Sequence, residues 1–330
     1  MSAFRTASSY AAVAAMTLCA GLTPAWSSTP GVPEIFAPGV ISGAGHEAAP
    51  AFTPDGKTVY FQRSTPAGSV ILVSHFARGK WSAPEIAPFS GEWNDIEPAM
   101  APDGSFLVFI SSRPITPGGK SIEGFYNGQA QDGGNLWRVD RERSGWSKPV
   151  RLPETVNRGT TMFAPAIAGD GSLYFMEPFG AKSRFRLYRS QYRDGQYEPA
   201  EPLPFSDGST TDVDPAVSPD ERFLIFGSGR PPAKGNIDLF IVQREGGQWG
   251  TPVHLGDVVN SPTSDAEPRL GTDGHTLYFS SERTLPQTFP RTPAQARADL
   301  ARVHDWDTGQ YNIWKLDIMP WLNGGPQNSH

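Results

Sequence analysis

A pattern of small, turn-forming and apolar positions recurs five times along the chain. Each copy starts with Pro, continues with a few small or apolar residues, crosses a tight turn and ends on alternating apolar and aromatic residues. The copies are PAFTPDGKTVYF from Pro50, PAMAPDGSFLVF from Pro98, PAIAGDGSLYF from Pro165, PAVSPDERFLIF from Pro215 and PRLGTDGHTLYF from Pro268. Asp caps such turns and Gly adopts their positive φ angle, so each copy predicts a β-hairpin.

The spacing of the copies predicts the architecture. Their prolines are 48, 67, 50 and 53 residues apart, which fits one four-stranded propeller blade per copy. A third apolar strand and a short fourth strand follow each hairpin, but the fifth copy lacks its fourth strand. Pro33-Glu34-Ile35 resembles the missing piece. We therefore predict an all-β, five-bladed propeller of four-stranded antiparallel blades, with the N-terminal strand closing the last blade.

Two insertions interrupt the repeat between the second and third strands of a blade. Residues 114–134 are rich in Gly and predict a rim loop, the kind of segment that often binds a partner. Residues 284–309 predict a helix, because Thr292, Pro293 and Gln295 form an N-cap, a first helical position and a capping-box position.

The first 25 residues have the pattern of a secretory signal. Arg5 is followed by a short apolar run from Tyr10 to Leu22, and Thr23-Pro24-Ala25 offers a cleavage site after Ala25. The alternative is a lipoprotein signal that uses Cys19, although Leu18 stands where a small residue is preferred. We expect residues 1–25 to be a signal peptide and residues 26–330 to be one propeller domain, periplasmic or secreted, without a membrane span after cleavage.

Composition narrows the classes of partner and chemistry. The net charge is −6 and there is no basic run, so nucleic acid is not expected as a partner. Cys19 is the only cysteine, so the cleaved chain would have no disulfide and no thiolate chemistry. His75, His254, His275 and His304 lack metal-ligand spacing, and we expect them at the surface.

Several segments resemble the WD-like β-propeller repeat of the TolB type. They include FLVFISSRP from Phe106, GWSKPV from Gly145 and LYFSSER from Leu277. The resemblance covers nearly all of the chain after residue 33. It implies a propeller in the cell envelope or outside the cell, often one that recognises another protein, and it names no particular partner.

Acidic residues recur just before the repeat prolines. Three residues ahead lie Glu47, Asp95, Asp212 and Asp265, with Met162 in the third copy. One residue ahead lie Glu97, Asp214 and Glu267, with Ala49 and Ala164 in the first and third copies. Arginines also follow the period at the ends of the second strands, at positions 63, 113, 230 and 283.

These residues allow three interpretations. Because acids and arginines share one period, Arg113, Arg230 and Arg283 could pair with the acids and stabilise the blades. Alternatively, the ring could bind a ligand or a divalent cation such as calcium, and no other cofactor is suggested. Third, a pair of the acids could act as catalytic groups. Catalysis needs unlike residues in unlike blades, so we name no catalytic residue.

Two functions therefore remain open. The first is a recognition or scaffold protein that binds an envelope or extracellular protein, or a glycan, through one propeller face and the two insertions. The second is a carbohydrate-active enzyme, a glycoside hydrolase or lyase, that uses carboxylates at the channel mouth. Arginines that reach the acids would count against the enzyme.

Overall fold

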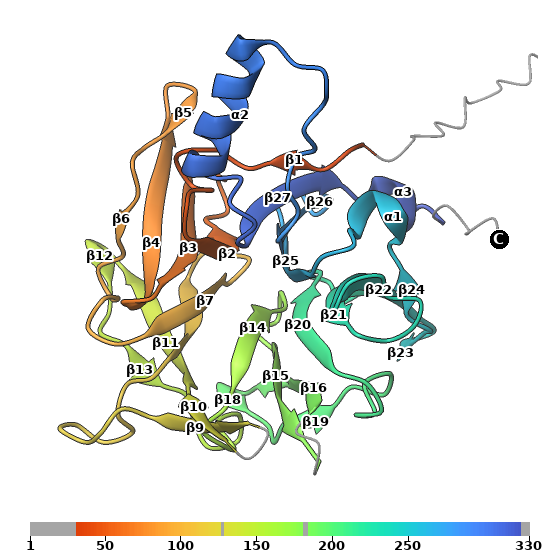
Figure 1. Cartoon of the computed structure of the whole chain (residues 1–330). Coiled ribbons are helices and arrows are strands. Elements are labelled where there is room, and N and C mark those ends of the chain that lie inside the picture. Colours follow the sequence, from red (N-terminus) through yellow and green to blue (C-terminus); the bar gives the residue numbers. More distant parts are fainter. Residues whose placement is uncertain (1–30, 127–128, 181–183, 325–330) are drawn as a thin grey trace, which may run out of the picture.

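In the computed structural model, residues 31–126, 129–180 and 184–324 are described. The predicted signal peptide lies outside these residues. Antiparallel sheets are arranged as five blades around a centre, as predicted, and Figure 1 shows their first strands gathered there.

The first three blades follow the order of the repeat. Blade one contains β2 (His46–Phe52), β3 (Thr58–Thr65), β4 (Gly68–Ala77), β5 (Lys80–Trp81) and β6 (Glu85–Ile86). Blade two contains β7 (Asp95–Met100), β8 (Phe106–Ser111), β11 (Asn135–Glu142), β12 (Gly145–Trp146) and β13 (Val150–Arg151). Blade three contains β14 (Phe163–Ile167), β15 (Leu173–Phe179), β16 (Arg184–Ser190) and β19 (Glu201–Pro202), beside the hairpin β17 (Tyr192–Arg193) and β18 (Gln196–Tyr197).

The last two blades complete the ring. Blade four contains β20 (Asp212–Val217), β21 (Phe223–Ser228), β22 (Asp238–Glu245), β23 (Gln248–Trp249) and β24 (Val253–His254). Blade five contains β25 (Asp265–Leu270), β26 (Thr276–Ser281), β27 (Asn312–Asp317) and β1 (Glu34–Ile35). β1 pairs antiparallel with β27, with Ile35 opposite Trp314.

The predicted insertions contain regular structure. Residues 114–134 carry the hairpin of β9 (Glu123–Tyr126) and β10 (Gln129–Asp132). Residues 284–309 carry α2 (Pro293–Asp305), whose Thr292 and Gln295 form the predicted capping box. Two single-turn helices, α1 (Gly256–Val259) and α3 (Met319–Leu322), lie on the same side of blade five in Figure 1.

Large apolar side chains of the second and third strands fill the space between blades. Phe109, Phe175, Phe226 and Phe279 occupy equivalent positions in their second strands, and all four are fully buried. Each belongs to a cluster that joins two neighbouring blades, such as the cluster of Phe226 with Tyr174 of blade three. Burial of these rings is the main stabilising contribution to the ring of blades.

The first strand of every blade has a β-bulge directly before its repeat proline. The pairing register shifts at this point in all five blades. The residue at the bulge has a φ angle near +50° in each case; these residues are Ala49, Glu97, Ala164, Asp214 and Glu267. Non-glycine residues rarely adopt this conformation. Because it recurs at the same position in all five blades, the bulge is a regular element of this fold.

Candidate functional site

The four acids that lie three residues before a repeat proline are all buried and all paired with an arginine. Each acid pairs with an arginine near the end of the second strand of the same blade: Glu47 with Arg63, Asp95 with Arg113, Asp212 with Arg230 and Asp265 with Arg283. Arg63 lies within its strand, and the other three lie two residues beyond the strand end. The nitrogen–oxygen distances are 2.6 Å for Arg63, 2.7 Å for Arg230 and 2.6 Å for Arg283. We call these four carboxylates the arginine-paired acids, and their geometry confirms the pairing interpretation.

The arginine of each pair also donates a hydrogen bond to a backbone carbonyl of the segment that precedes its blade. In blade two, Arg113 donates to the carbonyl oxygen of Phe89 at 2.5 Å, and Asp95 accepts from the Ser90 hydroxyl at 2.9 Å. Burial raises the pKa of Asp95, while Arg113 and nearby hydroxyl groups oppose that rise. The guanidinium also lies over the ring of Phe109, 5.3 Å from its centroid. Such charge-assisted bonds build the blade and leave these carboxylates with no open side for a substrate.

Blade three shows what replaces the pair. Met162 stands in the acid position and is fully buried. A different pair, Arg158 with Glu177, lies in this blade and is partly exposed. An apolar side chain can therefore occupy the acid position without loss of the blade, as expected when a buried ion pair gives little net stability.

A second group of carboxylates lies at the bulge positions. We call Glu97, Asp214 and Glu267 the channel acids, because the first strands that carry them contact one another around the centre of the ring. Glu97 accepts a hydrogen bond from the backbone N–H of Ala164, the bulge residue of the next blade, at 2.6 Å. Asp214 accepts in the same way from Glu267 at 3.1 Å. The bulges thus link neighbouring blades.

The channel acids share one electrostatic environment. Burial raises the pKa of all three, and the charges of Asp214 and Glu267 raise that of Glu97 further. For Asp214, burial and then Glu267 raise the pKa to about 7. Arg269 opposes these rises, and Ser280 donates to Glu267 at 3.1 Å. Such an environment favours the protonated form of each channel acid.

A pocket of about 260 Å³ lies where the first hairpin turns of the blades converge. We call this side the hairpin face; its turns are residues 53–57, 101–105, 168–172, 218–222 and 271–275. The lining is mainly Ala, Pro and larger apolar residues, including Ile167, Val217 and Leu270. Arg269 is the one charged residue among the described residues that line it.

Arg269 breaks the symmetry of the ring. The equivalent residues of the other blades are Ala51, Ala99, Ala166 and Ala216, and all four also line the pocket. The Arg269 side chain is buried, and its Nη1 donates to the carbonyl oxygen of Pro268 at 2.8 Å. Its Nε and Nη2 have no hydrogen-bond partner among the described residues. Sequence reasoning missed this residue, although PRL in place of PA at the fifth repeat was a visible signal.

The two insertions lie on the other side of the ring. In an antiparallel blade, the turn after the first strand and the turn after the second strand point to opposite faces. Both insertions follow second strands, so they belong to the face opposite the pocket, which we call the insertion face. The arginine-paired acids stand at the starts of the first strands and share the insertion face, as expected for the acid ring, whereas the pocket lies on the opposite face.

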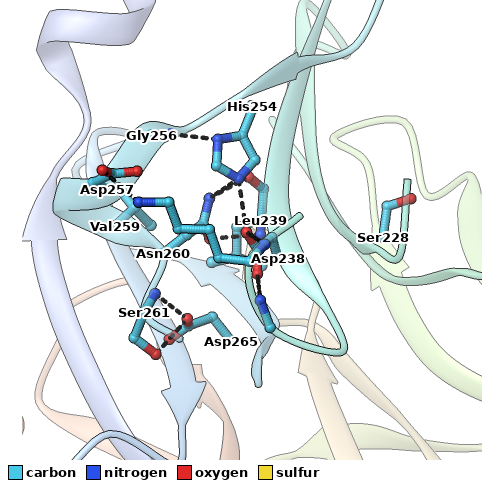
Figure 2. A network of polar contacts seen from close by, with 12 residues as sticks. Ser228, Asp238, Leu239, His254, Gly256, Asp257, Val259, Asn260, Ser261 and Asp265 are labelled. Atoms are coloured by element: carbon cyan, nitrogen blue, oxygen red, sulfur yellow. Dashed lines mark hydrogen bonds and ion pairs between the residues drawn. The ribbon is translucent and has the colours of Figure 1, made fainter. Parts of the chain in front are cut away.

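His254 is also placed differently from the sequence prediction, which put it at the surface. It is buried in blade four, where its Nε2 lies 2.8 Å from the Asp238 carboxylate (Figure 2). Gly256 N–H donates to its Nδ1 at 3.2 Å, so the proton is on Nε2 and is donated to Asp238. Asn260 meanwhile satisfies both backbone groups of Leu239. The network joins β24 and α1 to β22 and has a structural role.

Neither a metal-binding cluster nor a membrane-spanning helix is found in the described parts of the chain. No group of three or more His, Cys, Asp or Glu residues there is arranged to hold a metal ion. No helix in residues 31–126, 129–180 and 184–324 is long and apolar enough to cross a membrane.

Comparisons with known proteins give likeness in fold only. No family model matches the chain, and neither does any curated protein. Among solved structures it is similar to an α-L-arabinofuranosidase from Lactobacillus brevis, with a TM-score of 0.52 and 12% identity over 85% of this chain and 92% of that one.

Two weaker likenesses have TM-scores below 0.5. TolB from Acinetobacter baumannii has a TM-score of 0.47 and 14% identity over 83% of this chain, which spans about half (54%) of that protein. A gluconolactonase from Xanthomonas campestris has a TM-score of 0.48 and 13% identity, over 88% of this chain and 95% of that one. At such low sequence identities the comparisons support the β-propeller fold and give no information about function.

Proposed function

We propose that this protein is an exported recognition protein that binds a partner through the channel mouth on its hairpin face. The observation that carries the proposal is the contrast between the acids and the pocket. The arginine-paired acids are buried in ion pairs, which leaves them unsuited to catalysis, whereas the pocket is open and mainly apolar. A mainly apolar hollow with a few polar groups is typical of a binding site.

Export supports the choice of partner. The signal-like pattern of residues 1–25 favours a periplasmic or secreted chain, and hence an envelope or extracellular protein, or a glycan, as the partner. The TolB-type repeat pattern fits the same location. We further propose that β1 is the closing strand of the ring, because its pairing with β27 joins both ends of the chain in one blade without a disulfide.

Site-specific photo-crosslinking tests the binding face. A photoreactive residue at Thr272, exposed at the pocket, should give an adduct with an envelope component in cells. Thr65 is the matched control, since it is exposed at the end of β3 on the insertion face. Equal adducts from both positions, or an adduct from Thr65 alone, would contradict the proposal.

The second candidate is a carbohydrate-active enzyme, and the channel acids favour it. They come from three blades, and their raised pKa values suit proton transfer near neutral pH. Hydrolysis or elimination in a panel of glycosides and uronate polymers, lost in both Glu97→Gln and Asp214→Asn, would support it. Activity that survives both substitutions, or no activity at all, would exclude a role for these acids.

A further inference from the structure

The buried guanidinium of Arg269 lacks hydrogen-bond partners for two of its three nitrogen atoms within the described chain. Only 6% of the residue is exposed, yet Nε and Nη2 lack a hydrogen-bond partner among the described residues. A buried guanidinium with two unpaired donor atoms is costly, and such groups are normally satisfied by a counter-group. Within the described chain, no carboxylate lies within 4.0 Å of this guanidinium.

The neighbouring carboxylates do not supply a full counter-charge. The channel acids interact with Arg269 through space, but burial favours their protonated, neutral forms. Glu97 and Asp214 direct an oxygen at a backbone N–H of the next blade instead. The charge on Arg269 therefore lacks a full counter-charge within the described chain. Nε and Nη2 are closed to solvent, so an anion in the pocket reaches them only when the side chain turns toward it.

The pocket restricts the rest of the ligand. Its lining is alanine, proline and branched or straight apolar side chains, with few groups that could hydrogen-bond the hydroxyl groups of a sugar. Its volume of about 260 Å³ is below the range of roughly 300–1,000 Å³ for pockets that hold a whole drug-sized ligand. It is therefore suited to one small apolar group or to the end of a chain.

We propose that Arg269 is the anion-binding residue of this pocket and that its ligand is an apolar carboxylate. The inference rests on the proposed function and specifies the chemistry of the same site. The carboxylate pairs with the guanidinium, and the apolar group contacts the alanines of the other four blades. A free aliphatic acid and the C-terminal residue of a polypeptide share this chemistry.

Calorimetry and ligand-observed NMR with four probes test the proposal on the chain from residue 26. Isovalerate and N-acetyl-Ala-Leu carry a carboxylate; isovaleramide and N-acetyl-Ala-Leu-amide are their neutral counterparts. We expect the carboxylates to bind at least tenfold more tightly than the amides. Tighter binding of the dipeptide indicates a polypeptide C-terminus, and tighter binding of isovalerate indicates a free acid.

Two variants separate charge from folding. Arg269→Ala introduces the residue that the other four blades use, and Arg269→Met keeps side-chain volume without charge. Both should unfold cooperatively and bind the carboxylates at least tenfold more weakly, while Arg269→Lys retains part of the binding. Arg222→Ala, at an exposed arginine on the hairpin face, is the matched control and should bind as the wild type does.

Three results would overturn the inference: carboxylates and amides that bind equally, carboxylate binding unchanged in folded Arg269→Ala, or no binding of any probe at millimolar concentration. The crosslinking experiment remains independent of these results. An adduct at Thr272 that persists in Arg269→Ala would leave channel-mouth recognition in place and reject only the carboxylate chemistry.

Discussion

Asp212 and Asp214 lie two residues apart in β20, yet only the Asp212 carboxylate is paired with an arginine. Asp212 accepts from Arg230 at 2.7 Å and from the Ser228 hydroxyl at 2.6 Å within its own blade. Asp214 lacks an ion pair in the described chain and accepts from the backbone of the next blade. Burial and Glu267 raise the pKa of Asp214 to about 7. Arg230 thus compensates the charge of Asp212, whereas burial and Glu267 disfavour the charge of Asp214.

The comparison teaches that an acidic ring in a sequence need not be one site. The arginine-paired acids brace four of the five blades, whereas the channel acids join neighbouring blades at the bulges and influence one another's pKa. Four experiments would sharpen or break this distinction.

The largest expected effect is the loss of one partner from a buried ion pair. Asp212→Ala leaves Arg230 without its carboxylate and should lower the free energy of unfolding by about 3–5 kcal/mol. Replacing both partners, Asp212→Met with Arg230→Met, imitates Met162 of blade three and should cost clearly less. Urea unfolding of both variants measures the difference. A double variant as unstable as the single one would mean that the pair itself stabilises the blade.

A substitution at the neighbouring channel acid, Asp214, should raise the free energy of unfolding instead of lowering it. Asp214→Asn keeps an oxygen for the N–H of Glu267 and removes a group that ionises reluctantly. At pH 8 the variant should be more stable than the wild type by on the order of 2 kcal/mol. Urea unfolding at pH 8 checks this, with Asp212→Asn as the control that should destabilise. A loss of stability in Asp214→Asn would show that this carboxylate is held in its ionised form.

The pH dependence of the wild type follows from the same groups. The folded-state pKa values of the channel acids lie above their unfolded values, so the folded chain binds more protons. Their contribution to stability is complete below the unfolded pKa, about 4, and is lost as pH rises through about 7. The charged or titratable groups nearby are Arg269 and Tyr311, with Glu282 and His46 beside Tyr311. Burial lowers the pKa of His46, which opposes part of this fall in stability.

We therefore expect the free energy of unfolding to fall between pH 5 and pH 8. Urea titrations at pH 5, 6, 7 and 8 measure the slope, and the double variant Glu97→Gln, Asp214→Asn should flatten it. Stability that rises over this range in the wild type would contradict the assignment of protonated channel acids.

The smallest expected effect concerns the backbone at the bulges. Ala49 and Ala164 have φ angles of 51° and 52°, a region that glycine adopts without steric cost. Ala164→Gly should therefore stabilise the chain by roughly 0.5–1 kcal/mol, less the added chain entropy of glycine. Ala166→Gly, at a strand position without positive φ, is the control and should destabilise. Thermal unfolding that ranks the two variants in reverse would contradict a strained bulge.

Much of this arrangement could be predicted from the sequence because it follows the repeat. The hairpins, the blade count, the capped helix and the pairing of Asp95 with Arg113 all depend on residues that recur at fixed spacing. Local turn chemistry and strand alternation carry that information. The predicted ligand-binding and cation-binding roles of these acids stay predictions.

The remaining features are not signalled by the residue types of the repeat. The positive φ angle recurs before every repeat proline, but most residues at that position are alanine or glutamate, which seldom adopt it. The burial of His254 depends on its partner Asp238 across two strands. Arg269 stands where the other four blades have alanine. Comparing repeats for similarity emphasises the shared residues, so the one residue that differs was missed.

The bulge has a consequence for how this protein could vary. Because the backbone conformation recurs in all five blades, each blade offers one side chain at an equivalent place around the central axis. Three of these places hold carboxylates and two hold alanine, without any change in the path of the backbone. Single substitutions at these five positions can therefore change the charge and polarity around the central axis one blade at a time, because the backbone geometry there is constant.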